Sequence, residues 1–180
     1  VQKIKMVKEF RLSCNSPDTR KYAERPTLPT RMAYYSDNED TDVLLVPIVS
    51  SQRRKWLPVG YVDKNTIISY SCMIVPNANL YTFGIIESNV HMAWVRVVAG
   101  RLKSDFRYSN TIVYNNFPWC NPTDEQKAKI EQTAQAILNA RAKYPDCSLA
   151  DLYDELTMPP DLSKAHQEND KAVMQTYGYD

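Results

Sequence analysis

The sequence predicts an α+β fold: a mixed-sheet domain with one helix packed on it, followed by a small all-α domain. Up to about residue 118 the apolar segments are short and rich in β-branched and aromatic residues, whereas later apolar residues recur at helical spacing. The charge changes at the same point, because residues 1–118 contain 16 Lys or Arg and 10 Asp or Glu, and residues 119–180 contain 6 and 11. We therefore expect two domains, 1–118 and 119–180, of which the basic first one has the charge of a polyanion-binding surface.

Five segments of the first domain are expected to be strands, because each is short, rich in β-branched or aromatic residues and bounded by turn residues. They are DVLLVPIV (42–49), KWLPVGYV (55–62), NTIISYS (65–71), LYTFGII (80–86) and TIVYNN (111–116). One helix is expected over residues 89–99, capped by Ser88 and ended by Gly100. Its predicted apolar stripe consists of Val90, Ala93, Trp94 and Val97. The first 42 residues hold three prolines in PDTRKYAERPTLPTR and an acidic run, DNEDTD, and are not assigned to elements.

Three helices are expected in the second domain. Thr123 with Gln126 forms a capping-box pattern before residues 124–144, and Ser148 with Asp151 suggests a short helix over 149–156. After Pro159 and Pro160 a third helix is expected over 161–177, ending at Gly178. The apolar faces predicted for the two long helices comprise Ile130, Ala134, Ile137, Leu138 and Arg141, and Leu162, Ala165, Ala172, Val173 and Tyr177.

The composition favours a cytoplasmic protein without a membrane partner, because no apolar run is long enough to span a bilayer and the N-terminal residues are charged. Four separated cysteines and two distant histidines indicate neither a disulfide framework nor a metal site. With four glycines and no phosphate-binding loop, nucleotide binding is unsupported, and we expect no catalytic residue and no cofactor site in this chain. The tetrapeptide NFPW (116–119) resembles the catalytic loop of adenine-N6 and cytosine-N4 DNA methyltransferases, in which two prolines precede an aromatic residue. Because Phe117 stands in place of the first of these prolines, we interpret the tetrapeptide as an aromatic turn at the domain boundary.

Two stretches have the chemistry of a nucleic-acid contact. In GRLKSDFRYS (100–109) the charged residues Arg101, Lys103, Asp105 and Arg107 alternate with Leu102, Phe106 and Tyr108, so an extended chain would separate a charged from an apolar face. In SSQRRKW (50–56) hydroxyls, an amide and three cations lie between two expected strands, which suits phosphate contacts, and Gln52 could make a bidentate contact to adenine. The alternative for residues 50–56 is a solvated turn with no partner. The alternative for residues 100–109 is an ion pair between Lys103 and Asp105 on the surface.

Long, ordered phrases of the chain closely resemble the C-terminal third of the MmeI-like enzymes, which are type IIL restriction-modification proteins and related adenine-N6 DNA methyltransferases. They include VPIVSSQRRKWLPVGYV, VPNANLYTFGIIESNVHMAWVRVVAGRLKSDFRYS, IVYNNFPW and LADLYDELTMPPDLSKAHQENDKAVMQTYG, so the resemblance runs from about Val43 to Gly178. It implies a target recognition domain and a helical C-terminal domain that bind double-stranded DNA. An upstream methyltransferase domain of the same chain would bind S-adenosylmethionine, and a nuclease domain, where present, would use Mg.

The resemblance assigns base specificity to the pair Lys103 and Asp105, which occupy the variable positions of the family pattern RLxSx before RYS. Lys can donate to guanine and Asp can accept from cytosine N4, so this pair is expected to read one G·C base pair. Many relatives carry an acidic residue at the position of Gln52. The other expected base contacts are Gln52, Tyr70 and Ser71, and the expected backbone or flanking contacts are Ser50, Ser51, Arg53, Arg54, Lys55, Arg101 and Arg107.

Two other function classes share parts of this pattern. An RNA-binding module would have a similar basic and aromatic surface but would prefer unpaired bases stacked on exposed rings. A protein-interaction module would bind no nucleic acid in a salt-dependent way. Competition between duplex DNA and single-stranded RNA separates the three classes.

Overall fold

The computed structural model describes residues 2–24, 43–63, 66 and 68–179. Its contacts divide the chain into two compact units, Val1–Asp37 and Asn38–Asp180, which are described separately. The first unit holds two helices that the sequence did not assign, α1 (Gln2–Ser13) and α2 (Pro17–Ala23), the second capped by the side chain of Ser16. The acidic run at residues 37–42 lies outside the described residues. None of the helices in the described part is long and apolar enough to cross a membrane.

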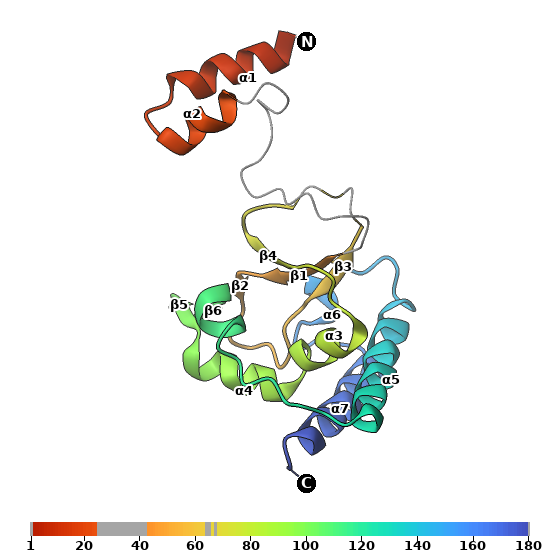
Figure 1. The fold of residues 1–180 in the computed structure, drawn as a ribbon. Coiled ribbons are helices and arrows are strands. Elements are labelled where there is room, and N and C mark those ends of the chain that lie inside the picture. Colours follow the sequence, from red (N-terminus) through yellow and green to blue (C-terminus); the bar gives the residue numbers. More distant parts are fainter. Residues whose placement is uncertain (1, 25–42, 64–65, 67, 180) are drawn as a thin grey trace. The chain divides into compact units, whose positions relative to one another are not determined.

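In the described residues of the second unit, the β-structure consists of two three-stranded antiparallel sheets (Figure 1). In the first, β1 (Val43–Pro47) lies between β3 (Gly60–Val62) and β4 (Cys72–Val75). In the second, β6 (Asp105–Arg107) lies between β2 (Val49–Ser50) and β5 (Gly100–Leu102). A single residue, Ile48, separates β1 from β2, so one expected strand contributes to both sheets.

Three of the five expected segments form no strand in the described residues. Residues 80–86 form α3 (Leu80–Ile86), whose first turn is capped by the side chain of Asn79, which accepts a hydrogen bond from the N–H of Thr82 at 2.9 Å. The segment 111–116 instead contributes to η1 (Asn110–Tyr114), a short π-helix. The described residues of 65–71 contain no strand, and β4 begins just after them at Cys72. Only the end of the segment 55–62 pairs, as β3.

The helix predicted over 89–99 is confirmed as α4 (Asn89–Val98), with Ser88 as its N-cap. Its predicted apolar stripe is partly right, because Val90 and Trp94 are partly buried and pack against a hydrophobic cluster. The fully buried face consists of His91, Met92 and Val95, while Val97 is 83% exposed. The buried face includes a polar residue because the hydroxyl of Tyr108 lies 2.9 Å from Nε2 of His91. A pattern based on apolar residues alone therefore found one edge of the packed face and missed its buried polar residue.

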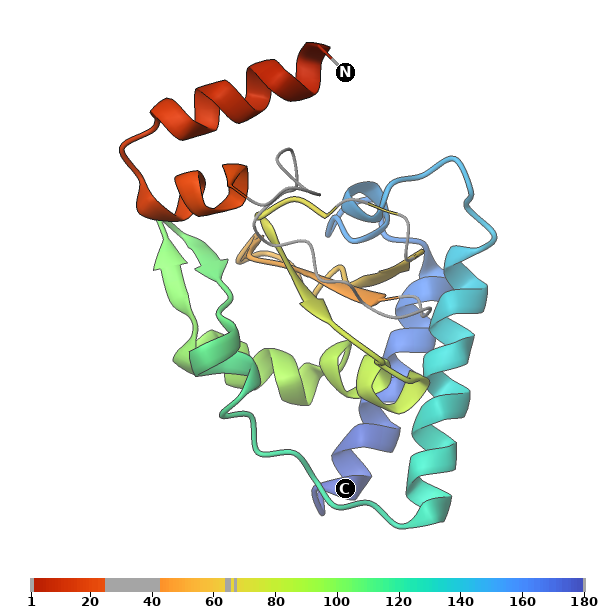
Figure 2. The same ribbon diagram turned by 45° about the horizontal axis from the view of Figure 1, so that its top comes forward.

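The helices predicted for the second domain are confirmed, with a shorter middle one. They are α5 (Asp124–Arg141), α6 (Leu149–Leu152) and α7 (Pro160–Thr176), and both predicted capping boxes are formed. In α5 the N–H of Gln126 donates to Oγ1 of Thr123 at 3.2 Å. Helices α5 and α7 lie side by side in both Figure 1 and Figure 2.

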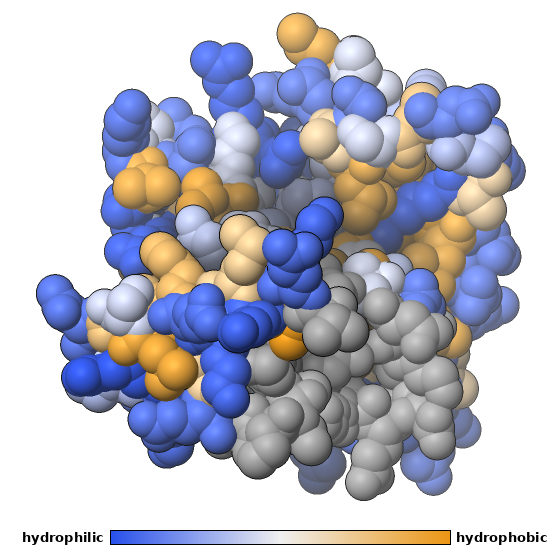
Figure 3. All heavy atoms as spheres, turned by 90° about the horizontal axis from the view of Figure 1, so that it is seen from above, coloured by the Kyte–Doolittle hydropathy of each residue, from blue (hydrophilic) through white to orange (hydrophobic). Residues whose placement is uncertain are grey.

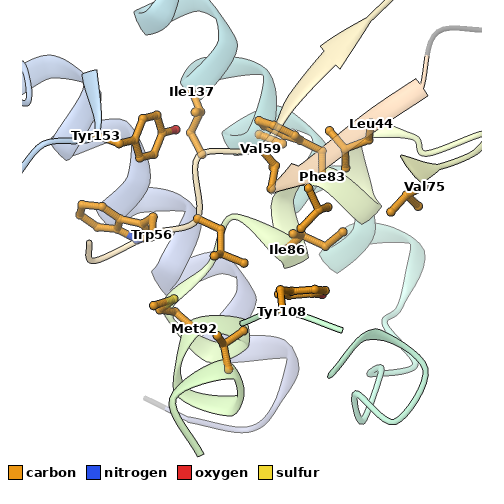
Figure 4. Packing of buried hydrophobic residues seen from close by; sticks show 14 of the residues in the cluster. Leu44, Trp56, Val59, Val75, Phe83, Ile86, Met92, Tyr108, Ile137 and Tyr153 are labelled. Carbon is orange, nitrogen blue, oxygen red and sulfur yellow. The ribbon is translucent and has the colours of Figure 1, made fainter. Parts of the chain in front are cut away.

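One hydrophobic core extends from the first sheet to these helices. Figure 4 shows Leu44 and Val75 from the sheet, Phe83 and Ile86 from α3, and Ile137 from α5 within it. Gly84 permits α3 to approach α5 closely, since a Cβ at this position would lie 2.7 Å from Cγ2 of Ile130. The expected boundary at residue 118 lies inside this unit, and the core contains residues from both sides of it.

The fold class, a mixed α+β structure with a helical C-terminal region, is confirmed. The tetrapeptide at residues 116–119 has a structural function at the join. The side-chain amide of Asn116 donates to the carbonyl oxygens of Thr111 and Ile112, and Phe117 is buried. These interactions support its interpretation as a turn.

Candidate functional site

The charged segment 100–107 is a β-hairpin rather than the single extended strand that the sequence suggested. Leu102 of β5 pairs with Asp105 of β6, which leaves Lys103 and Ser104 as a two-residue turn. Lys103 has φ 57°, and a positive φ at the first turn residue is a feature of type II′ hairpin turns. The guanidinium of Arg101 donates to the carbonyl oxygen of Ser104 at 3.1 Å and so braces the tip. Figure 2 shows this hairpin in green beyond the end of α4.

The expected separation into a charged and an apolar face is also wrong. Arg101 pairs with Phe106, and its guanidinium carbon lies 4.1 Å from the centre of that ring, so one cation covers the apolar side chain. Leu102 pairs with Asp105 and is 52% exposed. Lys103 and Asp105 therefore differ in position: Lys103 lies at the tip and Asp105 at the base of the turn.

The two stretches singled out in the sequence are brought together by β2 and β6. The backbone N–H of Gln52 lies 3.4 Å from Oδ1 of Asp105, because Ser50 pairs with Phe106 two residues earlier. An open hollow of about 560 Å³ lies between the loop and the hairpin. The residues of this main hollow are Ser51, Gln52, Arg53, Arg54, Ser104, Asp105, Tyr153, Asp154, Glu155 and Leu156.

Two cations line the hollow on the side of the loop. Within the described residues, the guanidinium groups of Arg53 and Arg54 make no ion pair, while the backbone of both residues is held by Ser51. The N–H of Arg54 donates to the carbonyl oxygen of Ser51 at 3.2 Å. A fixed loop thus carries two cations that are available to an anionic ligand.

A third side of the hollow is the turn that follows α6, and a buried polar network fixes it. The hydroxyl of Tyr153 lies 2.7 Å from Nε2 of His166 and accepts a hydrogen bond from Nε of Arg141 at 2.9 Å. Arg141 also forms an ion pair with Glu87. The ring of His166 stacks on Trp56 at a centroid distance of 4.6 Å, so the turn and the loop contact the same imidazole. Figure 4 shows Tyr153 and Trp56 on one side of the core.

Burial sets the protonation of this network. It lowers the pKa of His166 to about 3 and raises the pKa of Glu87 to about 7, although the guanidinium of Arg141 favours the carboxylate. The indole N–H of Trp56 donates to Oδ2 of Asp170 at 3.0 Å, which fixes the end of the loop to α7. The neutral imidazole therefore lies between two anchored aromatic rings and holds both sides of the hollow in place.

The remaining candidates lie in different places. Ser50 is 2% exposed, which excludes it as a surface contact in this conformation, and Arg101 is occupied with Phe106. Lys55 lines a small pocket next to Trp56, and Arg107 lines a second hollow with Ile48 and Met73. Tyr70, which is 75% exposed, and Ser71 line neither hollow. The carbonyl oxygen of Ser71 accepts a hydrogen bond from the backbone N–H of Ile48 at 3.0 Å.

Sequence reasoning did not nominate Ser104 or the residues 153–156. Ser104 has no special signal, and Tyr153 to Leu156 were expected to belong to a supporting helix. The early end of α6 could not be foreseen, because its capping box specifies only where that helix begins.

On the face drawn in Figure 3 hydrophilic residues predominate and apolar ones lie in separate groups. Within the described residues, no three His, Cys, Asp or Glu side chains gather as a possible metal site.

Comparison with known proteins gives consistent matches over the whole length. Residues 1–121 match the family model described as "MmeI, target recognition domain", and residues 122–180 match "MmeI, C-terminal domain". A DNA methyltransferase A of Bacillus subtilis (strain 168) is 35% identical over 177 residues, which are 98% of this chain and 20% of that protein. The chain is also similar to the type IIL restriction-modification enzyme MmeI, solved in complex with DNA, with 46% identity and a TM-score of 0.90 over 99% of this chain and 23% of that one.

Proposed function

Because the chain belongs to the family defined by the target recognition and C-terminal domains of MmeI, we propose that it binds double-stranded DNA and reads its sequence. The observation that most supports this proposal is the main hollow, in which the loop 51–54 and the tip of the β5–β6 hairpin meet. Cations that contact phosphates and polar groups that contact base edges are the two parts of a sequence-reading surface. The hollow combines both.

The two parts would have separate tasks. Arg53, Arg54 and Lys55, with the hydroxyl of Ser51, would hold the phosphate backbone and set the register of the duplex. The groups that would face the major groove are Gln52, Lys103 and Asp105, which suit adenine, guanine and cytosine N4 respectively. We keep Tyr70 and Ser71 as base contacts and Arg101 and Arg107 as flanking contacts, and we assign residues 119–180 to support of the recognition part.

The activity of the whole protein is a further part of the proposal, because the chain spans about a fifth of the length of the relatives it matches. We propose that this module presents a target adenine to a methyltransferase domain of the same protein in the cytoplasm. That domain would use S-adenosylmethionine for methyl transfer to N6, and a nuclease domain, where one exists, would need Mg. No residue of the present chain is assigned to these cofactors.

The proposal is tested with the complete natural protein and a library of duplexes with a randomised segment. Selection should enrich one short sequence, and affinity for it should fall steeply with salt, since each phosphate contact releases counterions. Single-stranded RNA should compete poorly. Enrichment of no sequence, or a stronger effect of the RNA competitor than of duplex DNA, would contradict the proposal and favour the RNA-binding or protein-interaction class.

A further inference from the structure

The turn after α6 lines the main hollow although it belongs to the part of the chain expected to act as a support. Hydrogen bonds within the turn hold its backbone. Oδ1 of Asp154 accepts from the N–H of Leu156 at 2.9 Å, and the carbonyl oxygen of Asp154 accepts from Met158 at 3.0 Å. Oγ1 of Thr157 donates to the carbonyl oxygen of Asp151 at 2.7 Å. Because the buried hydroxyl of Tyr153 anchors the start of the turn, its shape is fixed before any ligand arrives.

This turn presents two neighbouring side chains to solvent. Leu156 is 92% exposed, and Glu155 is exposed and makes no hydrogen bond or ion pair within the described residues. Both line the same hollow as Arg53 and Arg54. Because the backbone of the turn is already ordered, binding would cost only the ordering of these side chains and not that of the loop, so this arrangement suits a contact surface.

The charges determine which part of a duplex the turn can meet. A carboxylate is repelled by phosphates, so Glu155 would oppose binding unless it met groups that donate hydrogen bonds. The donors on the major-groove edge are the amino groups of adenine and cytosine, and the 5-methyl group of thymine is the main apolar feature there. An A·T pair carries a donor and this methyl group together, which matches an adjacent carboxylate and leucine.

On this basis, and resting on the DNA-binding function proposed above, we propose that Glu155 and Leu156 are specificity-determining residues that read an A·T base pair. The carboxylate of Glu155 accepts from adenine N6, and the side chain of Leu156 contacts the thymine methyl group. The pair lies in the same duplex whose backbone is held by Arg53 and Arg54. The C-terminal region is thereby part of the recognition surface.

The test uses the complete natural protein and the duplex enriched in the selection described above. Each A·T pair of that duplex is replaced in turn by purine·T, which removes the amino group, and by A·U, which removes the methyl group. At one position the natural protein should lose roughly tenfold in affinity for each change. Glu155→Ala should be insensitive to loss of the amino group there, and Leu156→Ala insensitive to loss of the methyl group. Glu155→Gln should keep the preference for adenine, because an amide can also pair with its edge.

Two exposed positions outside both hollows provide the matched controls. Asp146→Ala removes the same charge, and Val97→Ala trims another highly exposed apolar side chain, so both should retain the sensitivity of the natural protein. If no A·T position couples to Glu155 or Leu156 while the natural protein still selects its sequence, this inference is overturned and the turn faces something other than base edges. If the natural protein selects no sequence, the proposed function fails instead.

Discussion

Nε2 of His166 lies 2.7 Å from the hydroxyl oxygen of Tyr153, and this contact joins α7 to the turn that lines the main hollow. The same imidazole stacks on Trp56 at the end of the loop that carries Arg53 and Arg54. The two sides of the hollow are thus positioned by one buried, neutral ring, which explains how a small surface loop keeps a fixed geometry.

Tyr153→Phe should destabilise the protein strongly. The change leaves Arg141 and His166 buried without the hydroxyl that both contact, and an unsatisfied buried polar group costs about 1–3 kcal/mol. Urea unfolding measures the loss. Tyr144→Phe is the control, because its hydroxyl bonds to the half-exposed Asp161 and water can replace it, so an equal loss in both variants would contradict the account.

Gly84→Ala should lower the free energy of unfolding, against the usual helix preference for alanine. The added Cβ would lie 2.7 Å from Cγ2 of Ile130 and 3.1 Å from Oδ1 of Asn169, so α3 would have to move away from α5 and α7. Overpacking of this kind costs about 1–3 kcal/mol. Gly100→Ala is the control, since its Cβ would meet nothing closer than 3.8 Å, and thermal unfolding should separate the two variants.

Stability should fall in acid partly through His91. Burial lowers the pKa of His91 to about 3, whereas in the unfolded chain it titrates near its ordinary value of 6.5. Between these values the unfolded chain binds the extra proton, so the free energy of unfolding should drop by up to about 1.4 kcal/mol per pH unit as pH falls. His91→Gln lacks this contribution, and its stability should fall less steeply between pH 6 and pH 4. Parallel curves for the two proteins would show that the pKa of His91 is the same in the folded and the unfolded protein, which would contradict this prediction.

Arg53→Ala and Arg54→Ala should each weaken binding to all duplex sequences alike. Each contact with a phosphate contributes about −0.9 to the slope of log affinity against log salt, so each variant should have a shallower slope by about that amount. Fluorescence anisotropy over a salt series measures it. Arg96→Ala, an exposed cation of α4 that lines neither hollow, should leave the slope unchanged, and a similar change there would make the effect one of net charge.

The fold was predictable where the determining signals are local. Helices α4, α5 and α7 were identified by caps and spacing that lie within each segment. Residues 80–86 have the composition of a strand, but Asn79 caps them, and Gly84 packs against Ile130 on a distant helix. Tertiary packing therefore outweighed strand propensity, as is common for short apolar segments.

The candidate site was only partly predictable for the same reason. The residues of the loop 51–54 were nominated from their chemistry and Asp105 from the family resemblance, and the structure brings them together. The hairpin was missed because Lys103 and Ser104 occupy a turn that usually contains glycine or asparagine. The contribution of residues 153–156 depends on the contact between Tyr153 and His166, which no local pattern contains.

The hairpin tip contains Lys103 and Asp105, the pair to which we assign base specificity. Exchanging the charges of these two residues therefore tests the central claim. Lys103 occupies the turn and Asp105 begins β6, and we expect the two to read the partners of one G·C pair. Lys103→Glu with Asp105→Arg exchanges donor and acceptor, whereas either single change should weaken binding by about 1–3 kcal/mol. Lys103→Asn is the control for the backbone, because asparagine tolerates the positive φ of this position.

The most direct measurement is the sequence that the complete natural protein and its double variant each select from a randomised duplex library. The account predicts that the two selected sequences differ at one base pair, where G·C becomes C·G, and agree at every other position. The Lys103→Asn variant should bind its selected duplexes with lower affinity and should discriminate little between bases at that pair. If the double variant selects the unchanged sequence with undiminished affinity, Lys103 and Asp105 do not read that base pair and the central claim is wrong.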